Sequence, residues 1–380
     1  MSVAVKPVST WRERRQFLRL PWQIYRDFPY WVPPLRQMQK ELVGYARHPF
    51  QQIAEIQTFL ALRDGEPVGR IAAILNHASN RHFDEQRGYW GFFESIDDAA
   101  VAGPLFDAAR GWLAERGISS VRGPTNPSMN YECGLLIDGF DMPPTFLMPY
   151  NPPYYQRLIE SYGWVKTQDL FTFVGSVDQL ATLDPKLKRI WEGANERFNI
   201  NVRPIDKRRF KEEITLFLNI YNRSMASMWG FVPLTEEEIK RMASELKMLI
   251  LPQLALVAEV DGKPVGSVFG MPDYNPRIKK IDGRLLPFGW LTLLSRKPFR
   301  RFRAISTTVL PEYQMWGISV VLLAGLIPAV KDSGLHEAEF SWVAESNHLS
   351  RSSLQRGGAK YEKTHRMYDW PEGEKADASE

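Results

Sequence analysis

Gln314-Met315-Trp316-Gly317-Ile318-Ser319 stands between two contrasting stretches of sequence. The residues before it, Phe302 to Leu310, predict a strand, whereas the run VVLLAGLIPAV, which begins at residue 320, predicts a helix. The turn therefore presents backbone N–H groups at a helix N-terminus, where they lack intrahelical acceptors and where the helix dipole favours an anion. We expect the small residues Gly317 and Ser319 to let a phosphate group approach this backbone. Pro328 lies inside the expected helix and should kink it.

The same landmarks occur twice along the chain. The string Asp64-Gly65-Glu66-Pro67-Val68-Gly69 recurs with one change as Asp261-Gly262-Lys263-Pro264-Val265-Gly266, each time between two β-rich runs. Asp-Gly predicts a tight hairpin, because glycine adopts a positive φ without strain. Each hairpin is followed by a helix that ends near a glycine, by a strand that leads to an asparagine, and later by an amphipathic segment before Gly163 or Gly358. A single Asp-Gly hairpin is common, but four landmarks in matching order indicate an internal repeat.

Alternating strand and helix signals predict an α/β sheet with helices on its faces. We place the boundary between the halves in residues 176–199, a linker that contains a helical run from Pro185 to Phe198. The first lobe then comprises residues 1–175 and the second residues 200–372. Residues 373–380 are expected to form a disordered tail.

Composition restricts the class of protein. The 380 residues, 44% hydrophobic and 24% charged, are typical of a globular chain with two domains. Cys133 is the only cysteine, which excludes a disulfide framework and a cysteine-based metal site and indicates a reducing compartment. The charged N-terminus and the short apolar run from Leu285 to Ser295 do not predict secretion or membrane spanning, so we expect a cytoplasmic protein. A net charge of +4 does not indicate a nucleic-acid partner.

One stretch combines apolar and basic residues: RLLPFGWLTLLSRKPFRRFR, residues 284–303. Such a stretch suits the boundary of an anionic membrane, and it also suits a long acyl chain beside the phosphates of CoA or an acidic acyl carrier protein. The alternative is a β-hairpin whose charges are solvated. We therefore carry forward two expected partners, the inner face of the membrane through residues 285–303 and an acyl carrier protein.

The first half differs from the second at the turn before its helix. Asp97 and Asp98 stand there and would repel a pyrophosphate, so only the second lobe is expected to bind one. The first half also carries two polar, proline-punctuated stretches, GPTNPSMNYECGLLIDGF and FLMPYNPPYYQRL. We interpret them as an acceptor pocket, the alternative being loops whose Asn side chains bond to backbone groups. The pocket residues are Asn126, Asn130, Tyr131, Tyr150, Asn151 and Tyr154, with Glu132 beside them as a candidate catalytic residue.

The pattern Gln314-x-x-Gly317-x-Ser319 resembles the pyrophosphate loop of GNAT-type acyltransferases, which reads Gln/Arg-x-x-Gly-x-Gly/Ala; Ser319 departs mildly from it. The resemblance covers residues 201–370, with the first half as a more degenerate copy. It implies an α/β fold of tandem GNAT-like lobes, each a mixed, mostly antiparallel sheet flanked by helices. It also implies acetyl-CoA or a long-chain acyl-CoA as co-substrate, and no metal. The CoA contacts it implies are Val309, Gln314, Trp316, Gly317, Ile318, Ser319 and Asn347.

The resemblance implies direct transfer, in which an amine attacks the thioester carbonyl, a backbone N–H holds the oxyanion and the thiolate leaves. Glu345 is the candidate base, with a solvated loop carboxylate as the alternative. Many family members have a tyrosine on the next helix as the acid, where this chain has Gln355, which cannot donate a titrating proton. Tyr368 or Tyr361 is then the candidate acid, the alternative being a strand tyrosine in the core.

Longer motifs of the first half, FPYWVPPL, HPF, GFFESIDD, RGPTNPSMNYECGLLIDGF and YNPPYY, are similar to those of a bacterial family of two-lobed GNAT proteins. Relatives of that family include enzymes that N-acylate a sphingoid base in ceramide synthesis. The resemblance implies an N-acyltransferase acting on a small-molecule or lipid amine. Two alternatives remain: a tandem GNAT aminoacyl transferase that uses charged tRNA and needs a broad basic groove, and a non-catalytic binding protein.

Overall fold

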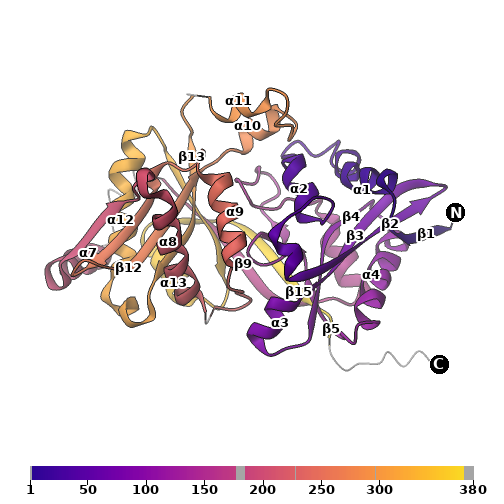
Figure 1. Ribbon diagram of the computed structural model, residues 1–380, viewed down its shortest axis with the longest axis horizontal. Helices are drawn as coiled ribbons and strands as arrows, with labels where there is room; N and C mark the ends of the chain where they lie inside the picture. Colours follow the sequence, from indigo (N-terminus) through magenta and orange to yellow (C-terminus); the bar gives the residue numbers. More distant parts are fainter. Residues whose placement is uncertain (1, 177–184, 227, 296, 372–380) are drawn as a thin grey trace. The chain divides into compact units, whose positions relative to one another are not determined.

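The computed structural model describes residues 2–176, 185–226, 228–295 and 297–371, and these form two compact units (Figure 1). The first unit groups the residues up to Asp169 with residues 278–289 and the described residues from Thr364 onward. The second comprises Leu170–Arg277 and Trp290–Lys363. The tail expected at residues 373–380 lies outside the described residues. Among the described residues, no helix is both long and apolar enough to cross a membrane.

The first unit is a sheet with helices on both faces. Its strands lie in the order β1 (Val3–Pro7), β2 (Ala54–Arg63), β3 (Glu66–Asn76), β4 (Arg87–Ser95) and β5 (Ser120–Gly123), antiparallel except for the parallel pair β4 and β5. Ile71 and Ala73 of β3 share a core with α4 (Ala99–Ala114) and α5 (Tyr154–Tyr162). The alternate residues Ala72 and Ile74 share a core with α1 (Trp11–Ile24) and α2 (Arg36–Leu42). Successive residues of β3 thus point to opposite faces of the sheet, as expected for a strand that is buried on both faces.

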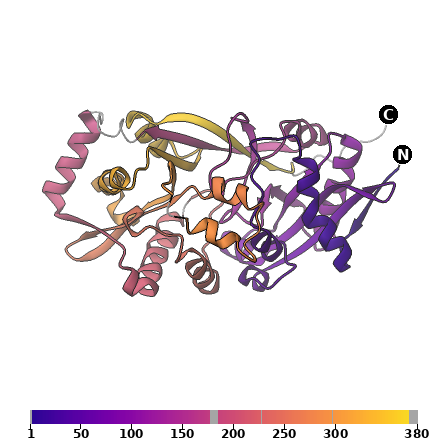
Figure 2. The same cartoon turned by 90° about the horizontal axis from the view of Figure 1, so that it is seen from above.

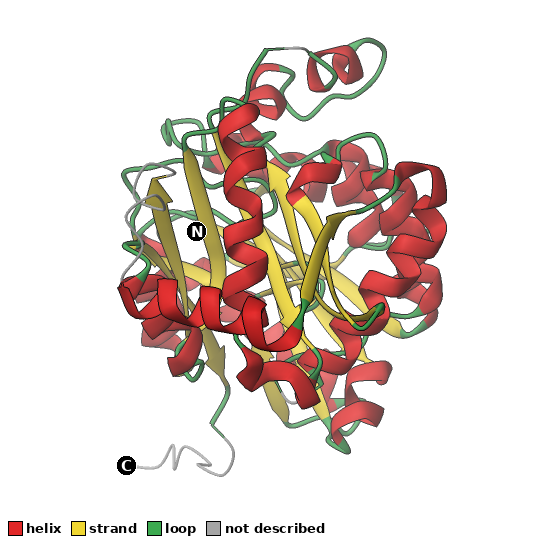
Figure 3. Ribbon diagram, turned by 90° about the vertical axis from the view of Figure 1, so that its left-hand side faces the viewer, coloured by secondary structure: helices red, strands yellow, loops and turns green. Residues whose placement is uncertain are grey.

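The second unit repeats this construction. Its strands lie in the order β10 (Ile200–Pro204), β11 (Ala255–Val260), β12 (Lys263–Pro272), β13 (Arg301–Val309) and β14 (Glu337–Ala344), with β13 and β14 as the parallel pair. Leu256 and Ala258 of β11 face α12 (Ile318–Asp332), whereas Val257 faces α8 (Phe210–Met225). Figure 3 shows these strands with helices on both sides. The helix α12 continues through Pro328.

Both predicted hairpins are present. Asp64 and Gly65 join β2 to β3 with φ of 52° and 83°, and Asp261 and Gly262 join β11 to β12 with φ of 50° and 72°. Two positive φ values in a two-residue loop match the right-handed twist of the paired strands. The predicted helix from Pro185 to Phe198 is also confirmed, as α7 (Pro185–Phe198).

The last strands of the two halves are exchanged. The first half ends with α5 and β9 (Val165–Ser176), and the second with α13 (His348–Arg356) and β15 (Lys360–Asp369). Residues 170–176 of β9 pair antiparallel with β14 and belong to the second unit. Residues 364–369 of β15 pair with β5 and with β8 (Leu135–Asp138) and belong to the first. The lobes predicted from the sequence, residues 1–175 and 200–372, are each contiguous and do not include this exchange.

Each half carries its own insertion. The first has the short strands β6 (Thr125–Asn126) and β7 (Glu132–Cys133), which pair with each other, followed by β8. The second has the short helices α10 (Asn275–Lys280) and α11 (Gly289–Leu293), drawn in orange in Figures 1 and 2. The hairpin considered for residues 285–303 is therefore wrong, because α11 occupies the apolar part and β13 begins at Arg301.

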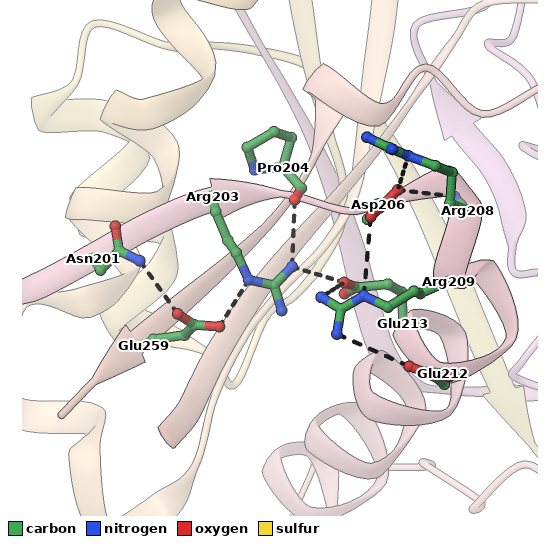
Figure 4. Close-up of polar contacts among 9 residues, drawn as sticks. All are labelled: Asn201, Arg203, Pro204, Asp206, Arg208, Arg209, Glu212, Glu213 and Glu259. Carbon is green, nitrogen blue, oxygen red and sulfur yellow. Dashed lines mark hydrogen bonds and ion pairs between the residues drawn. The ribbon is translucent and has the colours of Figure 1, made fainter. Parts of the chain in front are cut away.

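A polar network fastens α8 to the edge of the second unit's sheet (Figure 4). The guanidinium of Arg203 on β10 donates to Glu259 on β11, with Nε 2.7 Å from Oε1, and to Glu213 on α8, with Nη1 2.8 Å from Oε1. Glu213 is buried, so the cation offsets part of the free energy that burying its carboxylate costs. This pairing fixes the start of α8 against the strands.

Candidate acyl-CoA site and acceptor region

The strands β13 and β14 separate along their length. They pair in parallel from Arg301 with Glu337 to Ala304 with Phe340, and there the pairing stops. Beyond it, β13 continues against β12 as far as Val309, and β14 continues against β9 as far as Ala344. In the described part of the chain, backbone groups of residues 305–309 that point toward β14 therefore have no strand partner. Such groups are available to bind an extended ligand.

The predicted pyrophosphate turn follows β13 directly. Residues Pro311–Trp316 form a short 3-10 helix, and Gly317, with φ of 77°, caps the N-terminus of α12. The Gln314 side chain donates from Nε2 to the carbonyl of Val309 at 3.4 Å. Ile318 is fully buried, backbone included, whereas its neighbours Gly317 and Ser319 are partly exposed. The first N–H groups of α12 thus lie where the sequence predicts an anion site.

Gly317 has a second reason to be glycine. A Cβ at this position would lie 2.9 Å from Cγ2 of Ile190 and 3.2 Å from Cβ of Ala194, both on α7. Trp316 stacks on Phe198 at the end of α7, with ring centroids 4.1 Å apart. From the sequence alone, the glycine was explained only by the need for a phosphate group to approach the backbone. Close packing of α7 on this turn is an additional requirement.

Other predicted residues follow the neighbouring strand. Glu345 and Asn347 come directly after β14, and the C-terminal ends of parallel strands lie at the same edge of a sheet, so they share an edge with Val309 and the turn. Asn347 caps α13, its Oδ1 accepting from the backbone N–H of Ser350 at 3.1 Å. The carbonyl of Glu345 accepts from Nη1 of Arg351 at 2.8 Å. The second unit thus brings together the predicted CoA contacts and the candidate base.

Tyr368 belongs to the first unit. Its ring is fully buried among core residues of that unit, and its hydroxyl donates to Oε1 of Glu160 at 2.9 Å. Burial, together with the Glu160 carboxylate, raises the pKa of Tyr368 well above its usual value. Tyr368 and Glu345 therefore belong to different units. The role of Tyr368 as an acid stays a prediction. Tyr361, the other candidate, is in the second unit, 45% exposed, with its ring edge-on to Phe171 and Phe173.

Two of the predicted acceptor residues bond to backbone. Asn151 is buried, accepts from the N–H of Leu136 at 2.7 Å and donates to the carbonyls of Leu136 and Pro152 at 3.0 Å. Asn126 accepts at 2.6 Å from the N–H of Phe92, whose φ of 48° marks an irregularity in β4. These contacts fit the alternative interpretation, in which the Asn side chains of the loops bond to backbone groups.

The remaining predicted acceptor residues lie in the same unit. The ring of Tyr131 is edge-on to His48 and Phe50, and the N–H of Asn130 donates to Oγ of Ser128 at 3.3 Å. Glu132 lies on β7 and is half-buried. Their binding roles stay predictions.

Tyr150 and Tyr154 border a buried polar cluster that sequence reasoning missed. The hydroxyl of Tyr154 donates to the carbonyl of Ser95 at 2.8 Å, and the carbonyl of Tyr150 accepts from the hydroxyl of Tyr25 at 3.1 Å. Behind them, Oε2 of Glu94 accepts from Tyr155 at 2.7 Å. Burial raises the pKa of Glu94, although Arg70 and the tyrosine hydroxyls oppose the shift. A carboxyl group with a raised pKa beside hydroxyls can exchange a proton closer to neutral pH than a solvated one.

The sequence shows one sign of this cluster. Arg70 and Glu94 are charged residues inside the apolar strands VGRIAAIL and YWGFFES. A charge in such a run is rarely buried without a partner.

Known proteins resemble the chain along its whole length. No protein-family model matches it. It is 34% identical over 362 residues to Protein YghO of Escherichia coli K12, covering 93% of this chain and 92% of that protein. It is 33% identical over 379 residues to the Bacterial ceramide synthase of Caulobacter vibrioides, covering 97% of each.

Solved structures share the fold. A tandem GNAT protein from the clavulanic acid biosynthesis pathway superposes with a TM-score of 0.58 at 11% identity, covering 97% of this chain and 98% of that one. A GCN5-related N-acetyltransferase from Sphaerobacter thermophilus superposes with a TM-score of 0.54 at 15% identity, covering 97% and 95%. The predicted fold, tandem GNAT-like lobes with mostly antiparallel sheets flanked by helices, is confirmed.

Proposed function

We propose, from the premise that the chain belongs to the bacterial family of the Caulobacter vibrioides ceramide synthase and of Protein YghO, that it transfers an acyl group from acyl-CoA to the nitrogen of a lipid amine. Family and fold support acyl transfer in general. The finer parts of the proposal are a long acyl chain and an amine of the sphingoid type.

The observation that carries the proposal is the full-length similarity to a protein named for ceramide synthesis. A ceramide is an N-acylated sphingoid base, so a synthase of that kind joins an acyl carbonyl to a lipid amine. The similarity covers 97% of both chains and therefore includes both units. A likeness limited to one GNAT lobe would support acyl transfer but not the class of acceptor.

The turn before α12 suits the donor. In the proposed arrangement, the pyrophosphate of CoA binds the backbone N–H groups of the partly exposed Gly317 and Ser319, at the positive end of the helix dipole. The rest of the donor runs along the unpaired side of β13, whose backbone N–H groups can hold the oxyanion.

The reaction then needs one base. The amine nitrogen bonds to the thioester carbonyl carbon, the C–S bond breaks, and CoA leaves as the thiolate. Glu345, which follows β14 at the same sheet edge as Val309, takes the amine proton directly or through a water molecule.

Turnover by the purified protein tests the reaction. Palmitoyl-CoA and acetyl-CoA are each incubated with sphinganine, free thiol is measured, and the N-acyl product is identified by mass spectrometry. We expect thiol release that depends on both substrates, with palmitoyl-CoA preferred. Binding without turnover would favour a binding protein. Transfer from aminoacyl-tRNA alone would favour the tRNA-dependent alternative.

A charge placed in the first turn of α12 tests the donor site. Ser319→Asp should leave stability unchanged or slightly higher, because a carboxylate suits a helix N-terminus, yet weaken CoA binding about tenfold or more by repelling the pyrophosphate. Ser319→Ala is the uncharged partner of this variant. Thr235→Asp, at the N-cap of α9 (Glu236–Leu246) in the same unit, is the matched charged control and should leave CoA binding unchanged. Equal CoA affinity in all three variants would contradict the site.

A further inference from the structure

The short helix α11 presents large apolar side chains to solvent. Trp290, Leu291 and the following Leu294 are 44%, 51% and 40% exposed, whereas Leu293 is buried. Leu286 and Phe288, which precede them in the chain, are 81% and 72% exposed. Contiguous exposed apolar side chains on a globular protein mark an interaction surface.

The exposure is built into the structure, because a buried cation holds the segment. Arg277 donates from Nη1 to the carbonyl of Leu293 at 2.5 Å and from Nη2 to the carbonyl of Lys297 at 2.6 Å. Its guanidinium also lies 3.7 Å from the ring centroid of Phe299. The backbone on the C-terminal side of α11 is thereby fixed with Leu293 inward, and the neighbouring apolar side chains stay outward.

Most of the charges that neighbour α11 along the chain are positive, although Arg300 also lies 3.5 Å from the carboxylate of Glu337. Lys297 and Arg300 follow it and are exposed, and Lys280 and Arg284 precede it and are exposed. Asp282 is the only acidic residue between positions 274 and 303, and it accepts hydrogen bonds from Trp22 and Arg36. The partner of this surface is therefore expected to carry negative charge.

We propose that the α11 segment, residues 286–295 and 297–300, docks on the surface of a bilayer that contains anionic lipid. Trp290, Leu291 and Leu294 enter the boundary between headgroups and acyl chains, and Lys297 and Arg300 bind the headgroup phosphates. A lipid surface fits better than an acidic protein, because adjacent Trp, Phe and Leu side chains next to cations suit that boundary. This docking is independent of the proposed reaction, since it needs no substrate.

Vesicle flotation tests the docking. The full-length protein is mixed with vesicles of phosphatidylcholine alone or with added phosphatidylglycerol, at low and high salt. We expect binding to the anionic vesicles that weakens with salt, because salt screens the cations. Equal binding to both vesicle types without a salt effect would overturn the proposal that Lys297 and Arg300 bind the headgroup phosphates.

Two triple variants locate the surface. Trp290→Ser, Leu291→Ser and Leu294→Ser together should weaken vesicle binding at least about tenfold. The matched control changes three exposed apolar residues elsewhere, Trp11→Ser, Met248→Ser and Leu349→Ser, and should bind as the unchanged protein does. Thermal unfolding confirms that both are folded. The proposal is overturned if the first variant binds vesicles as well as the control does. It is also overturned if the first variant still binds vesicles but no longer binds an acyl carrier protein, because the surface would then be a protein-binding site.

Discussion

Arg70 on β3 and Glu94 on β4 face each other across the sheet of the first unit, with Nη2 3.3 Å from Oε1 and both side chains buried. The same register position in the second unit holds Ser267 and Thr308, whose hydroxyl oxygens are 2.9 Å apart. The positions correspond because the preceding residue is in each case the last glycine of the repeated string, Gly69 or Gly266, and pairs with the residue that ends the next strand. The two repeats therefore differ here by an ion pair in place of a hydroxyl pair.

Breaking the ion pair should be costly. Arg70→Met or Glu94→Leu alone leaves a buried charge without its partner and should lower the free energy of unfolding by about 3–5 kcal/mol. The double variant removes both charges and should cost clearly less than the sum of the single changes. Urea denaturation of the four proteins measures the coupling.

The second repeat supplies the control for this cycle. Ser267→Ala and Thr308→Val remove a neutral hydrogen bond, so each should cost about 1 kcal/mol and their coupling should be small. Additive costs at Arg70 and Glu94 would show that the guanidinium is satisfied by other contacts, such as the carbonyl of Phe17.

Asn151 should matter for stability rather than for substrate affinity. Asn151→Ala leaves the buried N–H and carbonyl of Leu136 without their partner and should lower the free energy of unfolding by about 2 kcal/mol or more. Asn201→Ala, at an exposed asparagine, is the control and should change stability by less than about 0.5 kcal/mol. Unchanged thermal stability with a raised KM for the amine would instead support direct binding by Asn151.

The fold was largely predictable because its signals are local. Asp64-Gly65 and Asp261-Gly262 specify their turns through φ, and the helix starts follow from adjacent residues. The exchange of β9 and β15 was not predictable. Over their first ten residues the two strands have the same order of buried and exposed positions although their sequences differ, and burial does not specify which strand a neighbour pairs with.

The site was predictable only where one segment builds it. The turn at Gly317 can be recognised from its own neighbours, as a strand followed by a helix with glycine between them. Glu94 could not be identified in this way, because its partners Arg70 and Tyr155 are distant in sequence. Tyr368 shows the reverse problem, since nothing in the adjacent sequence reveals that β15 ends in the first unit.

Acid should reveal the contribution of Glu13 to α1. Its carboxylate accepts from the N–H groups of Ser9 and Thr10 at 3.0 and 2.9 Å and pairs with Lys6 at 2.7 Å. The Lys6 ammonium and these backbone donors hold the pKa of Glu13 well below its usual value of 4.5. Because the folded-state pKa is the lower one, the stabilisation is present above pH 4.5 and is lost as the pH falls toward the folded-state value.

Comparison with Glu13→Gln measures this contribution. The variant should be less stable at neutral pH by about 0.5–1 kcal/mol, because it keeps the capping geometry but loses the charge. The difference should shrink as the pH falls below about 4.5, since the Glu13 carboxylate of the unfolded wild-type chain is then protonated while that of the folded chain stays charged. Denaturation curves recorded from neutral pH downward check this, and a constant difference at every pH would contradict the assignment.

Gly317→Ala should separate backbone strain from contact with α7. Gly334, after the other end of the same helix, has a similar φ of 69°, but a Cβ added there would meet no atom within 4 Å, so Gly334→Ala should cost only the strain, about 1–2 kcal/mol. Gly317→Ala should cost more, because its Cβ would meet Ile190. Adding Ile190→Ala removes the shortest of these contacts and should recover part of the excess, since the contact with Ala194 at 3.2 Å remains. If Gly317→Ala and Gly334→Ala prove equally destabilising in urea denaturation, α7 does not press on the turn, and the glycine there serves φ and the ligand alone.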